Sequence, residues 1–228
     1  MFHYSKVNGD VVSPGRGVLT TGSVPEPTFY GEFLKRFFDI FLIVVFTPVV
    51  LPLILLAALV IGRDGASPFY EQPRVGRNGK TFTCWKLRTM VADADERLER
   101  YLAENPSARE EWNATQKLKS DPRVTRIGRF LRMSSLDELP QLYNVLRGEM
   151  SLVGPRPMMP EQMSLYPGDA YYSLRPGITG LWQISDRNEC SFSERAEFDT
   201  KYARALSFSL DLSILMKTVG VVFRATGY

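Results

Sequence analysis

Histidine is almost absent from this chain of 228 residues, and the single one, His3, lies near the N-terminus. A Ser-His-Asp triad, a His-Glu-x-x-His zinc site and a histidine nucleophile are therefore all disfavoured. Acid–base or nucleophilic chemistry would have to come from Asp, Glu, Lys, Tyr, Ser or Cys side chains. A bound metal ion would have oxygen ligands, which favours Mg²⁺ or Mn²⁺ over zinc.

Cysteine is scarce as well, and basic and acidic residues are nearly balanced. Cys84 and Cys190 lie far apart and form no Cys-x-x-Cys motif, which argues against a disulfide framework or a cysteine metal site and fits a reducing compartment. The 28 basic and 25 acidic residues leave a net charge of only +3, so a basic patch would be local. Because the cations are not interleaved with stacking aromatic residues over a broad face, nucleic-acid binding is not indicated.

Composition divides the chain into three parts. Residues 1–30 are rich in Gly, Ser, Pro and Thr, which predicts a flexible tail, and they lack the basic and apolar regions of a signal peptide. Residues 31–62 are mostly apolar, and residues 63–228 have the composition of a soluble domain. A chain of this length can bury one good core. We therefore expect a tail, a membrane segment and one folded domain.

The apolar segment contains 22 successive residues without a charge, 40–61, and about 20 are enough to span a bilayer as a helix. Pro48 and Pro52 near its centre each remove a backbone hydrogen bond. Basic residues flank the segment on both sides, so the positive-inside rule gives only a weak preference. Two arrangements are open: a spanning helix, or a re-entrant helix bent at Thr47-Pro48 with both ends on the cytoplasmic side.

Asp39 immediately precedes this uncharged run. Lys35 and Arg36 lie four and three residues earlier, on the same face of a helix, so one of them is expected to pair with the carboxylate. The alternative is an ordinary charged residue at the membrane interface.

Residues 67–90 predict a β-hairpin. Asn78-Gly79 lies between two strand-like runs, which is the strongest short signal for a tight turn. In the second run Lys86 and Arg88 alternate with apolar residues and therefore share one face of the strand. That face is either simply solvated or binds an anion, for which the arginine offers a bidentate fork.

Three further segments predict helices. Residues 92–102 predict an exposed helix, followed by a polar loop around Asn105-Pro106. In residues 117–132 the arginines recur every three residues from Arg123 with apolar residues between them, which is typical of a helix on an anionic membrane or against the protein's own core. Residues 211–224 predict an amphipathic helix that packs on the core or at the interface.

The stretch 132–157 has the densest pattern in the chain. Ser135 and Glu138 have the spacing of a capping box, with the serine at N-cap and the glutamate at N3. Asp137 and Glu138 would then lie in the first turn of a helix, where unpaired N–H groups favour anionic side chains. Pro140 would be the fifth helical residue, where it leaves only the carbonyl of Leu136 without a helical donor and is tolerable so close to the start of the helix. From spacing alone, helix capping is a sufficient explanation of the carboxylate pair.

The same stretch, from Ser-Leu-Asp-Glu-Leu-Pro-Gln to Gly-Pro-Arg-Pro, resembles the bacterial sugar transferases. More closely, it resembles the small monotopic phosphoglycosyl transferases that prime exopolysaccharide synthesis, and the likeness extends over about residues 30–226. The resemblance implies an α+β fold, mainly helical with a short β-hairpin, anchored by an N-terminal re-entrant helix. Thr47, Pro48 and Pro52 would break that helix in the membrane.

The resemblance also implies the residues of the site. Asp137 would be the nucleophile, and Glu138 would bind Mg²⁺, with Mn²⁺ as an alternative. Two rigid motifs containing Gly and Pro, 154–157 and 174–183, would present polar side chains to phosphates. Family members usually carry a Gly-Arg pair where this chain has Asp before Arg187. The expected phosphate or substrate contacts are Lys86, Arg88, Arg156, Arg175, Gln183 and Arg187.

The implied reaction is transfer of a sugar 1-phosphate from a UDP-sugar, with galactose or glucose as the sugar, to undecaprenyl phosphate. It would proceed through an aspartyl-phosphosugar intermediate with release of UMP, at the cytoplasmic face of the bacterial inner membrane. A homodimer is compatible with this function, and the sequence does not identify the sugar. Two other classes remain open: a membrane-anchored scaffold that recruits acidic lipids or partners, and a metal-dependent hydrolase of nucleotide sugars.

Overall fold

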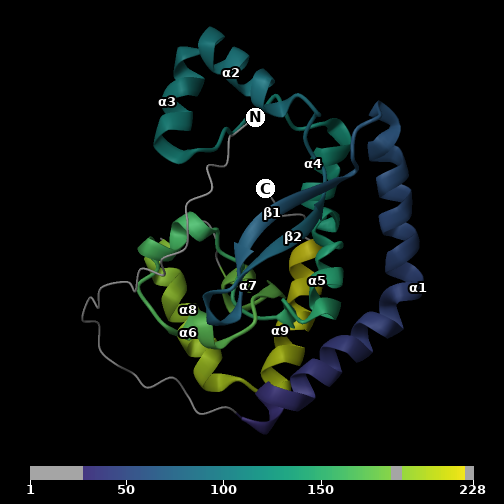
Figure 1. Cartoon of the computed structure of the whole chain (residues 1–228), viewed down its shortest axis with the longest axis vertical. Helices are drawn as coiled ribbons and strands as arrows, with labels where there is room; N and C mark the ends of the chain where they lie inside the picture. The colour runs from purple at the N-terminus through teal and green to yellow at the C-terminus, as the bar shows by residue number, and fades with distance from the viewer. Residues whose placement is uncertain (1–27, 186–191, 224–228) are drawn as a thin grey trace.

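The computed structural model describes residues 28–185 and 192–223. All but the last three residues of the predicted tail lie outside the described residues, as do Arg187 and Cys190. The described part is mainly helical, with one antiparallel β-hairpin and one short pair of parallel strands (Figure 1). The predicted fold class is confirmed.

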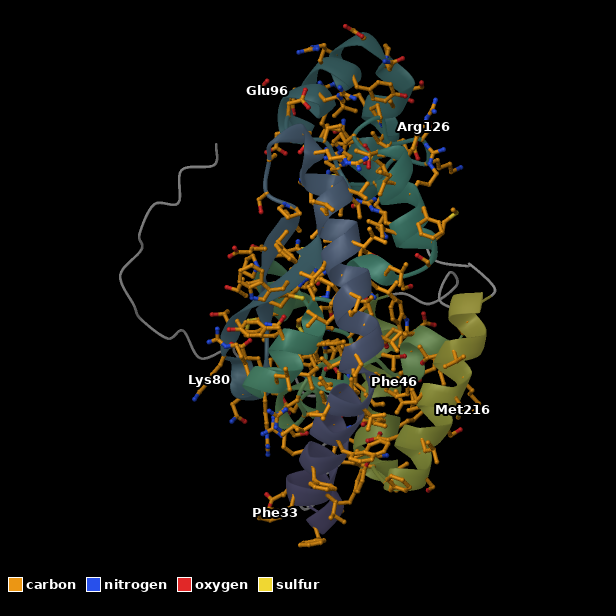
Figure 2. The ribbon with its side chains drawn as sticks, turned by 90° about the vertical axis from the view of Figure 1, so that its right-hand side faces the viewer. Phe33, Phe46, Lys80, Glu96, Arg126 and Met216 are labelled. Atoms are coloured by element: carbon orange, nitrogen blue, oxygen red, sulfur yellow. The ribbon has the colours of Figure 1, made fainter. Side chains whose placement is uncertain are left out.

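The N-terminal helix α1, Lys35–Ile61, follows a π-helical turn at Tyr30–Leu34 and leads into a 3₁₀ turn at Gly62–Asp64. By length and composition this helical stretch could cross a membrane. Only 6% of its most apolar 18-residue segment is buried inside the protein. Figure 1 shows α1 running along the edge of the molecule. Figure 2 shows Phe33 on the preceding π-helical turn and Phe46 on α1, and their side chains are 63% and 55% exposed. The apolar surface of α1 is therefore available to lipid.

Pro48 and Pro52 bend α1 without ending it. Because neither residue has an N–H group, the carbonyls of Val44 and Pro48 lose their helical donors. Thr47 Oγ1 donates an additional hydrogen bond to the Ile43 carbonyl at 2.6 Å. Figure 1 shows α1 changing direction part-way along its length. The predicted bend is therefore found, but within one continuous helix rather than at a break, because the remaining hydrogen bonds keep the turns around the prolines helical.

The predicted hairpin is confirmed. β1, Phe69–Val75, pairs antiparallel with β2, Thr81–Leu87. In the turn Arg77–Gly79, Asn78 and Gly79 have φ angles of 60° and 74°, a left-handed conformation that Asn and Gly adopt at the least steric cost. The turn residues therefore fix the pairing of the two strands.

α2, Ala94–Glu104, and α3, Pro106–Thr115, form a helical hairpin that projects from the rest of the molecule (Figure 1). The helix predicted over 92–102 is thus found two residues later. The predicted polar loop at Asn105-Pro106 is wrong, because Pro106 is the first residue of α3. Proline is well tolerated there, since the N–H groups of the first helical turn make no hydrogen bond within the helix. A small apolar cluster stabilises the hairpin, comprising Leu98, Tyr101, Leu102, Ala108, Trp112 and Leu118.

α4, Arg126–Met133, is much shorter than the helix predicted over 117–132. Thr125 caps its first turn with its side-chain oxygen. Just before it, the Asp121 carboxylate binds both the backbone N–H and the guanidinium of Arg123, the latter at 2.7 Å, and this local pairing replaces helical hydrogen bonds. The exposed apolar side chains of α4 are Ile127, Phe130 and Met133.

Two short strands that the sequence did not predict form a parallel pair, β3, Ser151–Val153, with β4, Gly177–Thr179. Their backbones approach very closely at one point, since a Cβ on Gly177 would lie 2.1 Å from the Gly154 nitrogen. Only glycine fits there. The glycines of the two rigid motifs therefore serve this close backbone contact.

The remaining elements surround this strand pair. They are α5, Gln141–Arg147; a 3₁₀ helix, Pro160–Leu165; α6, Ala170–Ser173; α7, Leu181–Ile184; α8, Phe192–Ala205; and α9, Phe208–Phe223. Tyr202 of α8 and Ile214 of α9 are buried together against Val153. α9 confirms the predicted C-terminal helix. Its outer face remains apolar, with Met216 67% exposed (Figure 2).

The first turn of α1 is tied to segments far along the chain. Lys35 Nζ lies 2.5 Å from Asp211 Oδ2, and Arg36 donates to two backbone carbonyls of α5. Asp39, 2% exposed, accepts a hydrogen bond from the Leu152 N–H at 3.1 Å. The predicted ion pair of Asp39 with Lys35 or Arg36 is therefore wrong. Tertiary partners take all three side chains, because this end of α1 packs against α5, α9 and β3.

Candidate active site

Asp137 and Glu138 lie in the connection between α4 and α5, where Leu136–Glu138 forms a single 3₁₀ turn. The predicted capping box is wrong, because Ser135 is left-handed, with φ 56°, and its side chain caps no helix. Pro140 is the N-cap of α5 and not an interior residue. The two carboxylates therefore belong to a tight turn between two helices rather than to the first turn of one helix.

Lys86 faces this turn from β2, with 2.6 Å between its Nζ and Glu138 Oε1. Asn144 of α5 fixes the arrangement, since its Nδ2 donates to the Thr83 carbonyl at 2.7 Å and its Oδ1 accepts from the Trp85 N–H at 3.1 Å. Asn144 is fully buried, so these bonds are shielded from water. The side chain of one asparagine thus joins α5 to β2 and presents Lys86 to the carboxylates.

The Asp137 carboxylate is poorly solvated. Burial raises the pKa of Asp137 to about 6, and the adjacent Glu138 adds to the rise, whereas Lys86 and Arg132 oppose it. Among the described residues, no side chain donates a hydrogen bond to this carboxylate. Its oxygens are therefore available to a ligand.

A cavity of about 880 Å³ lies against the carboxylates. One wall is polar, and we refer to it as the polar wall; it consists of Lys86, Arg132, Asp137, Glu138, Arg156 and Gln183. Its cations suit a ligand with phosphate groups. A cavity of this size is large enough to enclose most of a small-molecule ligand.

Arg132 and Arg74 belong to this region, although neither was predicted as a site residue. Arg132 Nε donates to Thr89 Oγ1 at 2.9 Å, and its side chain lines the cavity. The only signal in the sequence was its position at the start of the stretch 132–157. Arg74, on β1, donates to the Pro157 carbonyl at 3.1 Å and so supports the motif that carries Arg156. No local pattern marked Arg74, because its role depends on the pairing of β1 with β2.

Arg156 and Gln183 come to the polar wall from the two rigid motifs, as predicted. The Arg156 guanidinium lies 5.8 Å from the centre of the Trp182 ring, and that of Arg195 lies 5.7 Å from the same ring. These are cation–π distances, and Trp182 therefore helps to hold Arg156 in place. Gln183 is 3% exposed and lines the cavity.

The other predicted cations are placed differently. Arg88 lines the cavity, but its guanidinium also binds Asp64 at 2.6 Å and three backbone carbonyls, which ties the end of α1 to the hairpin. Arg175 is not among the residues that line the cavity, and its Nε donates to the Gly148 carbonyl at 3.0 Å. Arg187 lies outside the described residues. The structure thus brings Lys86 and Arg156 to the carboxylates and gives Arg88 and Arg175 contacts within the protein.

A family model for bacterial sugar transferases matches residues 30–225, which is nearly the whole described chain. The chain belongs to this family. The family predicted from the central stretch is confirmed, and with it the phosphoglycosyl transferase class at the level of the family.

This sugar transferase is 50% identical over 214 residues to the exopolysaccharide production protein ExoY of Rhizobium meliloti, a match that covers 90% of this chain and 93% of the relative. It is 48% identical over 198 residues to a UDP-galactose-lipid carrier transferase of Erwinia amylovora. It is 47% identical over 198 residues to an undecaprenyl-phosphate galactose phosphotransferase of Salmonella typhimurium. In these two matches 86% of this chain covers 42% of the relative, so the chain spans less than half of their length.

The carboxylate pair of the sugar transferase fits a magnesium ion that a substrate helps to bind. The described residues contain no group of three or more His, Cys, Asp or Glu side chains that could hold a metal ion by themselves. Mg²⁺, however, is commonly bound by one or two carboxylates together with substrate phosphates. Asp137 and Glu138 provide such carboxylates beside a cationic cavity.

Proposed function

We propose that this sugar transferase moves galactose 1-phosphate or glucose 1-phosphate from a UDP-sugar to undecaprenyl phosphate, the first membrane step of exopolysaccharide synthesis. The observation that carries the proposal is the Asp137 carboxylate on the wall of a cavity that also contains Lys86, Arg132 and Arg156. Cations that neutralise phosphate oxygens allow an anionic nucleophile to approach phosphorus. The names of the Erwinia and Salmonella relatives support the lipid acceptor and galactose.

In the first step an oxygen of Asp137 attacks the β-phosphorus of the UDP-sugar. A bond forms between the carboxylate oxygen and phosphorus, the bond from this phosphorus to the oxygen bridging the two phosphates breaks, and UMP leaves with its electron pair. A pKa of about 6 leaves Asp137 mostly ionised near neutral pH, so it can attack without a separate general base.

In the second step a phosphate oxygen of the lipid attacks the same phosphorus. The acyl phosphate bond breaks, and Asp137 is regenerated as a carboxylate. The lipid then carries the sugar through a diphosphate. Such a route requires UMP to leave before the lipid reacts, which is the kinetic pattern of a ping-pong enzyme.

The surrounding residues position and neutralise the diphosphate. Lys86 holds Glu138 beside the nucleophile, and Arg132 and Arg156 supply positive charge from two other segments. Mg²⁺ held by Glu138 and Asp137 would add charge neutralisation of the phosphates. Arg88 is the cation that we expect to contribute least, because Asp64 and backbone carbonyls engage its guanidinium.

The contacts of α1 support a re-entrant helix with both ends at the cytoplasmic face of the inner membrane. Near its start, Lys35 binds Asp211, and at its end the Ile61 carbonyl accepts from Arg88. Both partners belong to one folded domain. A spanning helix would separate its ends by a hydrocarbon core of about 30 Å, and a domain on one side of the bilayer could not bind both.

A transfer assay tests the proposed function. Purified protein, Mg²⁺ and undecaprenyl phosphate are incubated with a panel of UDP-sugars, and UMP release is measured. We expect a single-turnover burst of UMP without lipid, sustained release with lipid, and mass-spectrometric detection of sugar phosphate on the peptide that contains Asp137. Sustained release without lipid would instead identify a hydrolase. No release from any donor, with Asp137 dispensable in cells, would favour the scaffold.

A further inference from the structure

The cavity beside Asp137 has a second wall that is apolar. Its side chains come from the α5 region, from α9 and from the two parallel strands, and we refer to them as the leucine wall: Leu139, Leu142, Leu152, Ile178 and Leu215. We propose that the leucine wall binds the first isoprene units of the acceptor lipid while the lipid phosphate lies against Asp137. This inference rests on the proposed function and adds the route by which the acceptor enters.

The leucine wall is poorly suited to the sugar or the nucleoside. The hydroxyls beside it, those of Thr179 and Thr218, lie 2.7 Å apart and bond to each other, and Thr218 also bonds to the Ile214 carbonyl at 2.8 Å. Sugar hydroxyls placed here would lose hydrogen bonds with water and gain few in return. An isoprenoid chain would gain from leaving water. The donor phosphates therefore belong at the polar wall, and an apolar chain along the leucine wall.

The leucine wall continues to the protein surface along two helices. On α9, Leu215 lies one turn from Leu212 and one turn from Val219, which are 43% and 53% exposed. On α5, Leu142 lies one turn from Leu146, which is 47% exposed. Apolar side chains thus lead from the cavity to the outer faces of both helices. A lipid tail that leaves the cavity along this track would stay on apolar surface.

The outer end of this track lies beside the membrane helix. Arg36 of α1 donates to the carbonyls of Val145 and Leu146, so the exposed Leu146 adjoins α1. Lys35 of α1 pairs with Asp211, the residue before Leu212. Figure 1 shows α1 running past α5 on this side of the molecule. A lipid in the bilayer around α1 can therefore reach Asp137 with its phosphate first.

Two glutamine variants test the proposal. Leu215→Gln places an amide in the leucine wall, and Leu165→Gln places the same amide on the 3₁₀ helix, at a residue that is 67% exposed and lies neither on the cavity nor on the track. In detergent solution we expect Leu215→Gln to lower kcat/KM for undecaprenyl phosphate by about 10-fold to 100-fold. The UMP burst and the KM for the UDP-sugar should stay close to wild type, and Leu165→Gln should leave all three unchanged.

The outcomes separate the two proposals. An absent UMP burst in the wild-type protein would overturn the proposed function itself. A normal burst with an unchanged kcat/KM for the lipid in Leu215→Gln would overturn the leucine wall alone. If Leu215→Gln raised the KM for the UDP-sugar as much as it lowered kcat/KM for the lipid, the leucine wall would bind the donor and the proposal would be overturned.

A comparison of acceptors on the wild-type protein does not depend on how the variants fold. Farnesyl phosphate and propyl phosphate carry the same head group, but only the former carries isoprene units. Below the critical micelle concentration of the lipid, we expect farnesyl phosphate to be used with at least roughly 100-fold higher kcat/KM. Equal use of the two acceptors would show that the cavity recognises the phosphate only and would overturn the proposal.

Discussion

Two lysine–carboxylate pairs of nearly equal length differ in their surroundings. Lys35 Nζ lies 2.5 Å from Asp211 Oδ2, and Lys86 Nζ lies 2.6 Å from Glu138 Oε1. The Asp211 side chain has no exposure, whereas that of Glu138 is 20% exposed and lines the cavity. Length alone therefore does not distinguish a pair that holds the fold from one that serves a site.

The partners of each carboxylate explain the difference. Asp211 also accepts from the hydroxyls of Tyr30 and Tyr202, each at 2.7 Å, so both of its oxygens are occupied and it joins the start of α1 to α8 and α9. Beside the Lys86–Glu138 pair lies the Asp137 carboxylate, to which no side chain among the described residues donates a hydrogen bond. Burial raises the pKa of Asp137. A buried carboxylate with all its oxygens satisfied stabilises a fold, and one that faces a cavity is ready to react.

The largest effect that we expect is on activity, from Asp137→Asn. An amide cannot form the acyl phosphate, so UMP release should fall by roughly 10⁴-fold or more. Stability should respond differently. The pKa of Asp137 in the folded state, about 6, exceeds the usual value of 3.8, so ionising it costs stability as pH rises from about 4 to 6. Asn removes this cost, and Tm at neutral pH should be unchanged or higher. Residual UMP release near the wild-type rate would contradict the assignment.

Asp211→Asn is the matched variant at the other pair. It removes the negative charge that Lys35 faces in a buried site, which typically lowers the free energy of unfolding by about 3–5 kcal/mol. Thermal unfolding in detergent should show a lower Tm, while the UMP burst per folded molecule at low temperature stays near that of the wild type. A variant with an unchanged Tm and no UMP burst would instead place Asp211 in the chemistry.

Lys86→Met should move the pH dependence of the first step. Because Asp137 must be ionised to attack, the rate of UMP release should fall below an apparent pKa near 6 in the wild-type protein. The charge of Lys86 lowers the pKa of Asp137, so its removal should shift this acid limb to higher pH. A pH–rate profile of UMP release measures the shift, with Lys35→Met as the comparison that should leave the limb in place. If the acid limb did not move in Lys86→Met, the charge of Lys86 would not influence the ionisation of the nucleophile.

Trp182→Leu should have the smallest effect. Loss of the ring removes a cation–π contact of Arg156, and such contacts are worth about 0.5–2 kcal/mol. We expect a rise of a few-fold in the KM for the UDP-sugar with little change in kcat, measured by steady-state release of UMP. Trp182→Phe keeps an aromatic face and should restore most of the affinity. Equal defects in both variants would point to packing rather than to Arg156.

The sequence predicted the site's chemistry better than its geometry. The Ser135–Glu138 spacing indicated a capping box, yet the left-handed Ser135 gives a turn, because α4 and α5 must meet there. Lys86 and Arg156 were predicted and line the cavity, whereas Arg175 was predicted and binds the Gly148 carbonyl. Arg132 was predicted on a helix that lies on an anionic membrane or packs against the core, and its side chain lines the cavity. A motif identifies reactive residue types, but which cations reach them depends on packing.

By itself, the sequence determined the features that depend on neighbours in the chain. An uncharged run over 40–61 specified the apolar helix, and Asn78-Gly79 specified the hairpin. The near absence of histidine disfavoured histidine chemistry, and the family resemblance of the stretch 132–157 then indicated Asp137 as the nucleophile. Tertiary structure alone decided that Lys35 would meet Asp211, 176 residues away, and that Asn144 would align Lys86 with Glu138. The physical reason is that turn and helix propensities act over a few residues, whereas burial and the pairing of charges are set by segments that meet only in the folded chain.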